Sequence, residues 1–369
     1  MPAEIVVAIL EAVQASGSSA ENNRTLASSA LVCRDWSIIA QKILFRRVSL
    51  ASAPALQGFM NAVAPSTPRG SMLAETVQAL RCVIDAKQPR GISQLDFARA
   101  VLQCPKLSEL TLAVYGDISR AVRVPHSGVQ RCTKVSSSLF DDEVLSLLQT
   151  GPSITALRFD NWSDNAFALS QLLEVFPSIT SLNITGTTPA LSSPTLPSPC
   201  ALTQLRMNLR TPPSTEFIQS LLRSEASSLR VLEFKRSPTP QLLEDLLVQH
   251  CGTLESLTLP SCASLECAAA LACCTRLRNL HIEDLWTASN AKHSLPPTLE
   301  TLAFTVDKQT ALEPILETVK SSTSLRAVTM HVLAAGASHA QLPSLKMECA
   351  MQGIEYRSLN TIQEFRVTS

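Results

Sequence analysis

The feature that most constrains this chain is a six-residue unit, LxxLxL, with aliphatic or aromatic residues at its first, fourth and sixth positions. It occurs nine times, starting at Leu107, Ile154, Ile179, Leu202, Leu229, Leu254, Leu277, Leu299 and Leu325. Consecutive starts lie 47, 25, 23, 27, 25, 23, 22 and 26 residues apart. A unit that recurs at this period folds by stacking its copies, because one copy cannot bury its apolar face alone.

The unit predicts a strand whose fourth and sixth residues point into one core, since successive side chains of a strand alternate between two faces. Between the units, apolar residues recur every three or four positions, which indicates helices. The clearest of these segments are 143–149, 166–176, 215–224, 240–250 and 311–320. Seven of the eight spacings fall within the range of about 20–29 residues that leucine-rich repeats use. We therefore expect an α/β fold, a curved leucine-rich-repeat solenoid with a parallel sheet on its concave face.

The array is irregular in three places. The ninth position, usually Asn or Cys in such repeats, keeps that identity only at Cys262. The 47-residue spacing predicts a degenerate repeat or an insertion near residues 115–153. The Pro- and Ser-rich segment 187–200 predicts a loop on the outer face. A weaker copy of the unit starts at Val77, and a first strand is expected around Val48. A non-solenoid α/β domain with coincidental leucine spacing is the alternative.

Composition excludes several classes of function. Lys plus Arg equals Asp plus Glu, 31 each, without a basic run, which argues against nucleic-acid binding. No apolar stretch is long enough to span a membrane, so we expect an intracellular protein, cytoplasmic or nuclear or both. The eleven cysteines form no CxxC pair and no zinc spacing, and we expect reduced thiols that serve as small core residues.

The first 50 residues do not follow the repeat. Ile5, Ile9, Leu10 and Val13 lie on one helical face, and a polar break at 16–23 is expected to end that helix. Two further helical stretches, 25–33 and 35–45, follow. Fewer than 50 residues cannot bury this many apolar side chains among themselves, so the module is expected to present apolar surface to a partner.

Residues 1–48 resemble the F-box family. The family pattern Leu-Pro-x-Glu-Ile, Val-Cys-Arg-x-Trp and Leu-Tyr/Phe-Arg is similar to stretches of this sequence, with Met1 in the place of the first Leu. The matching positions are Pro2, Glu4, Ile5, Val32, Cys33, Arg34, Trp36, Leu44, Phe45 and Arg46. The downstream repeats resemble the leucine-rich arrays common in fungal F-box proteins.

The resemblance implies the substrate-recognition subunit of an SCF-type (cullin–RING) ubiquitin ligase, with no chemistry on this chain. It divides the chain into an F-box, 1–50, and a leucine-rich-repeat solenoid, 51–369. The F-box would bind a Skp-family adaptor protein through residues for which burial inside the module is the alternative: Pro2, Ile5, Ile9, Val32, Cys33 and Trp36.

The repeats would bind a protein substrate on the concave face, where the fifth residue of each unit projects outward. This column mixes both charges with small polar groups, which favours a protein surface over a single anionic ligand. The residues expected to contact a substrate are Arg158, Asn183, Arg206, Glu233 and His281.

An enzyme is the less favoured class. The six histidines form no HxH or HExxH arrangement, and no GxSxG, GxGxxG or phosphate-binding loop motif occurs. The acidic run 141–143 opens a helix, where the helix dipole explains it. His250 and Cys251 are neighbours that face different ways on a helix. We expect no metal and no cofactor. A leucine-rich-repeat interaction scaffold without a ubiquitin-ligase role is the second hypothesis.

Overall fold

The computed structural model describes residues 2–15, 19–85, 87–116, 139–163, 165, 167–189, 200–222, 228–262, 264–284, 295–333, 336, 339–359, 361 and 365. The chain divides into two compact units. The first comprises residues 1–194 with 198–200, and the second comprises residues 195–197 with 201–369. Most of the Pro- and Ser-rich segment 187–200 lies outside the described residues.

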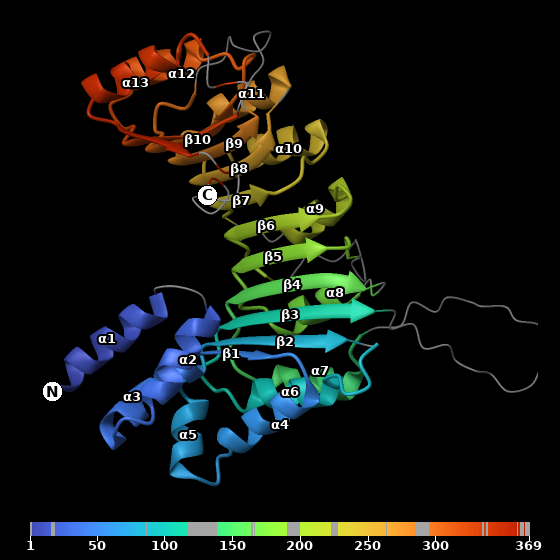
Figure 1. Ribbon diagram of the computed structural model, residues 1–369. Coiled ribbons are helices and arrows are strands. Elements are labelled where there is room, and N and C mark those ends of the chain that lie inside the picture. Colours follow the sequence, from blue (N-terminus) through green and yellow to red (C-terminus); the bar gives the residue numbers. More distant parts are fainter. Residues whose placement is uncertain are drawn as a thin grey trace, which may run out of the picture. The chain divides into compact units, whose positions relative to one another are not determined.

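The first unit begins with three helices and continues with strands that alternate with helices (Figure 1). Its helices are α1 (Ala3–Ala15), α2 (Ser19–Ser29), α3 (Arg34–Arg46), α4 (Ala53–Ala62), α5 (Pro68–Ala74), α6 (Gln94–Leu102), α7 (Asp142–Gln149) and α8 (Ala168–Val175). Its strands are β1 (Arg47–Leu50), β2 (Ala79–Asp85), β3 (Glu109–Gly116), β4 (Ala156–Ser163) and β5 (Ser181–Gly186).

The second unit repeats the same alternation. Its strands are β6 (Gln204–Leu209), β7 (Val231–Phe234), β8 (Ser256–Ser261), β9 (Asn279–Asp284), β10 (Thr301–Val306), β11 (Ala327–Val332) and β12 (Glu355–Leu359). Its helices are α9 (Thr215–Leu222), α10 (Pro240–His250), α11 (Leu265–Ala272), α12 (Glu313–Ser321) and α13 (Leu342–Met351).

Every predicted LxxLxL unit forms a strand that begins at the third residue of the unit. Within each of the two compact units of the chain, consecutive strands pair in parallel. Equivalent leucines lie side by side, as in Leu110 with Leu157 and Leu257 with Leu280. The weaker copy at Val77 becomes β2, and the stretch around Val48 becomes β1. The predicted alternation of parallel strands and helices is confirmed, including all five helices expected from apolar spacing.

The core is built from the fourth and sixth residues of each unit. In β8, Leu257 and Leu259 are buried while their neighbours in the strand are half-buried. The first residue, such as Leu254, is buried as well. Each repeat therefore places three large apolar side chains in the core and leaves the odd strand positions for the opposite face.

The 47-residue spacing contains an insertion rather than a degenerate repeat. Strand β3 pairs directly with β4 over eight residues, from Glu109 with Ala156 to Gly116 with Ser163. A strand belonging to an additional repeat would have to lie between β3 and β4, and this pairing leaves no place for one. Helix α7 occupies the end of the inserted sequence, at the position that a repeat helix takes.

The expected polar break at 16–23 is wrong for its second half, because α2 starts at Ser19. Asn22 is buried in this helix, and its side-chain amide donates a hydrogen bond of 3.1 Å to the carbonyl of Gln14. Glu21 lies in the first turn, where a carboxylate interacts favourably with the helix dipole. Asn22 is polar because its hydrogen bond holds α2 against the end of α1.

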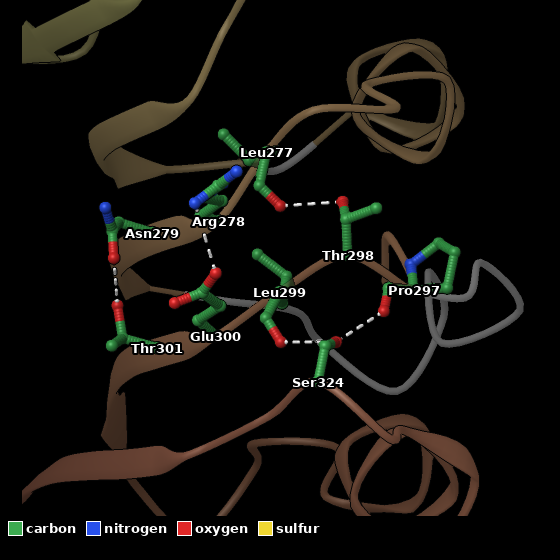
Figure 2. Close-up of polar contacts among 9 residues, drawn as sticks. All are labelled: Leu277, Arg278, Asn279, Pro297, Thr298, Leu299, Glu300, Thr301 and Ser324. Carbon is green, nitrogen blue, oxygen red and sulfur yellow. Dashed lines mark hydrogen bonds and ion pairs between the residues drawn. The ribbon is translucent and has the colours of Figure 1, made fainter.

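A ladder of hydroxyl groups links successive repeats just before their strands (Figure 2). The donor is the hydroxyl group of the residue just before an LxxLxL motif. The acceptor is the carbonyl oxygen of the first residue of the LxxLxL motif one repeat earlier. Four such bonds measure 2.8 to 2.9 Å: Ser178 to Ile154, Thr253 to Leu229, Thr298 to Leu277, and Ser324 to Leu299. Ser324 also donates to Pro297 at 2.7 Å. The ladder satisfies carbonyl groups of buried residues that the strand pairing has not yet reached.

Replacing Thr298 with Val tests the ladder, because the change keeps the side-chain shape and removes the donor to Leu277. We expect the free energy of unfolding to fall by about 1 kcal/mol, the typical net value of such a bond. Urea denaturation of the full chain measures it. Thr258→Val is the control, since this hydroxyl on β8 has no hydrogen bond within the described part of the chain, and equal losses for the two variants would contradict the ladder.

Candidate protein-binding surfaces

The first three helices form a small module around a shared apolar core. The core consists of Val6, Leu10, Leu26, Ala40 and Ile43. Two polar contacts join its outer helices: the Arg46 guanidinium lies 3.1 Å from a carboxylate oxygen of Glu11, and the Gln14 amide donates to the carbonyl of Ile43 at 3.4 Å. Arg46 and Glu11 are both substantially exposed, so the ion pair contributes little stability by itself.

The module leaves an unusual amount of apolar surface uncovered. Of the ten exposed large hydrophobic residues in the described part of the chain, five lie within residues 5–38. They are Ile5 (49% exposed), Ile9 (43%), Leu31 (86%), Val32 (65%) and Ile38 (43%). Ile5 and Ile9 are one helical turn apart and therefore share a face of α1. Large exposed apolar groups concentrated on one module indicate a surface for a protein partner.

Five of the six residues expected to meet an adaptor are exposed: Pro2, Ile5, Ile9, Val32 and Cys33. Trp36 differs, because it is partly buried against the core of the module. Leu31 and Ile38 were missed by the sequence reasoning. Leu31 directly precedes Val32 in the turn after α2, so its position in the motif could have indicated it.

The module is joined to the repeats by an unbroken run of structure. Helix α3 ends at Arg46, and β1 begins at the next residue. The Phe45 ring stacks on Phe59 of α4 with centroids 6.4 Å apart. The Arg69 side chain donates to the Gln41 side chain at 2.9 Å. The three helices are therefore anchored to the first repeats by covalent continuity, apolar packing and a hydrogen bond.

In the first unit, the open strand face carries an internal ion pair. The Arg158 guanidinium lies 3.1 Å from Asp160, whose carboxylate is largely buried. Asn183 is half-buried and lies next to Arg158 in the register of β4 and β5. Strand alternation places residue seven of the unit on the same face as residue five, so Asp160 could have been included from the sequence.

In the second unit, Glu233 lies between two cations. Its carboxylate is 3.2 Å from Arg206 on the neighbouring strand and 2.8 Å from the Lys235 ammonium. Arg206 and Glu233 stand opposite each other in the register of β6 and β7. The group carries one excess positive charge, and both cations remain partly exposed. The sequence reasoning named Arg206 and Glu233 but did not identify them as partners, and it missed Lys235.

His281 does not lie open on this face as expected. It is buried, and its ring lies 4.2 Å, centroid to centroid, from the ring of Phe365. Phe365 follows the last repeat by many residues, so no local pattern in the sequence indicates that it covers β9.

The groups that could suggest chemistry lie apart or buried. No cluster of three or more His, Cys, Asp or Glu residues suited to a metal ion occurs among the described residues. His250 is buried, and burial lowers the pKa of its imidazole. Burial also raises the thiol pKa to about 12 at Cys82, Cys104 and Cys274, which keeps these groups neutral and poorly nucleophilic.

No protein-family model matches the sequence, and no curated protein matches it. Within the described residues, no helix has both the length and the apolar character that crossing a bilayer requires.

Alkylation by iodoacetamide at pH 8 should separate the thiols into two groups. Cys33 and Cys273 are exposed and should react within minutes. Cys82, Cys104 and Cys274 should stay unmodified, since with a pKa of about 12 only about one thiol in 10⁴ is ionised at this pH. Peptide mass spectrometry measures the extents, and all five should react in urea. Native labelling of Cys82 as fast as Cys33 would contradict the burial.

Proposed function

We propose that this protein is the substrate-recognition subunit of an SCF-type ubiquitin ligase, and that it catalyses no reaction itself. In this proposal, residues 1–50 form an F-box that binds a Skp-family adaptor, and the leucine-rich repeats bind a protein substrate. The observation that carries the proposal is the concentration of exposed apolar residues on the three-helix module, two of which, Ile5 and Val32, fall on the F-box pattern.

The adaptor contact would centre on Ile5, Ile9, Leu31 and Val32. Burying an aliphatic side chain of this size contributes about 1.5–3 kcal/mol relative to leaving it exposed, so these four residues would supply the main apolar contribution to the contact. Trp36 supports this surface, because its side chain packs against the core of the module. We therefore assign Trp36 a positioning role and assign the direct contact to the four exposed residues.

The connection between α3 and β1 supports a ligase role over a loose tether. Ubiquitin transfer depends on where the substrate is held, because proximity and orientation set the rate of a reaction between two bound partners. The stacking of Phe45 on Phe59 and the contact of Arg69 with Gln41 fix the module to the first repeats. A scaffold that merely collects partners has no need of such a fixed connection.

An interaction scaffold without a ligase role is the second candidate. The mixed-charge strand faces favour it equally, since they suit a protein partner in either case. The two candidates differ in one property, the binding of a Skp-family adaptor by the helical module.

Replacing Ile9 with Asp should weaken adaptor binding tenfold or more, because a carboxylate in an apolar contact costs at least about 1.4 kcal/mol. Co-precipitation with a purified Skp-family adaptor and titration by calorimetry measure the effect. Val248→Asp is the control: it places the same charge on an exposed aliphatic position of α10, outside the module. Binding that survives Ile9→Asp would exclude the proposed contact. Protection of Cys33, but not Cys273, from alkylation by added adaptor gives an independent readout.

Arg206→Glu tests the substrate side. It turns the group of Arg206, Glu233 and Lys235 from a net charge of plus one to minus one, and it sets two carboxylates side by side. We expect the yield of proteins captured by proximity labelling in cells to fall by about tenfold for direct partners of this face.

Reversing all three charges, Arg206→Glu with Glu233→Arg and Lys235→Glu, is the control for stability. It rebuilds both ion pairs in the opposite direction at the same net charge as Arg206→Glu, so it should unfold at the wild-type denaturant concentration. An unchanged set of labelled proteins in Arg206→Glu would place the substrate elsewhere.

A further inference from the structure

Strands β9 and β11 depart from the burial pattern of the other repeats. In β7 and β8, the fifth residue of the unit is half-buried, as the open face requires. His281 of β9 and His331 of β11 stand on this same face, yet both are buried. Something other than the helices must cover them, because the helices pack on the opposite side of the strands.

Among the described residues, the side chain of Phe365 contacts both histidines on this face. This residue is fully buried, and its ring lies 4.2 Å from the His281 ring and 5.7 Å from the His331 ring, centroid to centroid. The rings are tilted at 44° and 31°, which are ordinary arrangements for aromatic pairs. Phe365 therefore lies between the two histidines, across the strand that separates them.

The strand register explains why a ring fits there. On β10, Ala303 lies beside His281, and Thr305 lies beside His331. Neighbouring strands are about 4.8 Å apart, so β9 and β11 are separated by about twice that distance. Two imidazole rings form the walls, and a small Ala with a short Thr forms the floor. We name these four residues the ring slot.

The ring slot contains polar atoms that Phe365 cannot satisfy. His331 Nδ1 and Thr305 Oγ1 are buried and have no hydrogen-bond partner within the described part of the chain. Burying a polar atom without a partner opposes folding. A permanent core at this place would be built from aliphatic residues, whereas His and Thr can return to water when the cover leaves.

We infer that the ring slot is a binding site for a Tyr or Trp side chain of a protein partner, and that Phe365 occupies it as an internal competitor. A phenol O–H or an indole N–H entering the slot supplies the donor that Phe365 lacks, while its ring keeps the stacking on His281 and His331. Phe365 thus limits access to the strand face at His281 and His331. This inference rests on the proposed function, in which that face binds the substrate.

The test uses the full chain and a fluorescent peptide of residues 360–369, with Phe, Tyr, Trp or Ala at the position of Phe365. The Phe365→Ala protein should bind the Phe peptide at least tenfold more tightly than the wild-type protein does, because its slot is open. The Tyr and Trp peptides should bind it more tightly still, and the Ala peptide should not bind. Adding Ala303→Phe to this protein should abolish binding, since the floor of the slot is then filled.

Two results would overturn the inference. One is equal binding of all four peptides, or equal binding to the wild-type and Phe365→Ala proteins. The other is a Phe365→Ala protein as destabilised in urea as Phe304→Ala, a change in the fully buried core of β10, since Phe365 would then be part of the fold. Neither assay contains adaptor or ubiquitin, so failure here is separate from failure of the ligase proposal.

Discussion

One backbone contact sets the register on which the whole architecture depends. The carbonyl oxygen of the second residue in a unit accepts hydrogen bonds from two successive N–H groups of the next unit. In one instance, Arg278 O accepts from Glu300 at 2.8 Å and from Thr301 at 3.0 Å. The same pattern recurs in both compact units, at the carbonyl groups of Ser108 and Thr155 in the first and of Thr203, Arg230, Glu255 and Glu300 in the second. It fixes the position at which each strand starts, so that equivalent leucines pair. A shift of the register by one residue would move all of these leucines to the exposed face.

The hydroxyl ladder links successive repeats before their strands, whereas the Asn that most repeats lack at the ninth position would hydrogen-bond the turn after the strand. One residue earlier, the buried Asn161 at the end of β4 makes a comparable turn, donating to the carbonyl groups of Asn165 and Thr187. Because the ladder and the backbone contact lie before the strands, the register does not depend on the side chains at the third, fifth and seventh positions of a repeat. They can differ from repeat to repeat, from the ion group around Glu233 to the ring slot at His281, without disturbing the register.

The sequence predicted what depends on local periodicity. Strands could be placed to the residue because each unit specifies both its burial and its start, and helices with strong apolar spacing followed. Helices α4, α5, α6, α11 and α13 were not predicted: the first three precede the first strong unit, α11 lies in a short connection, and α13 follows the last unit. The break at Ser19 was misjudged because Asn22 is polar for a contact with Gln14 that only the folded helices reveal. The exposure of Ile5 and Ile9 agrees with the expectation that so small a module cannot bury all its apolar side chains, whereas Trp36 follows in part the alternative of burial inside the module.

The burial of His281 marks the limit of such reasoning, and it also explains the contrast between the two candidate surfaces. In both surfaces, the chain segment carries more apolar or aromatic side chains than the residues near it in sequence can bury. In the helical module the excess stays exposed among the described residues, because three short helices within residues 3–46 cannot bury all their apolar side chains. On β9–β11 a distant residue of the same chain supplies the cover. A partner can therefore contact the first surface without displacing any described residue, whereas a side chain that enters the ring slot must first displace Phe365. The free energy needed to displace Phe365 lowers the apparent affinity of the second surface, and the first surface carries no such cost.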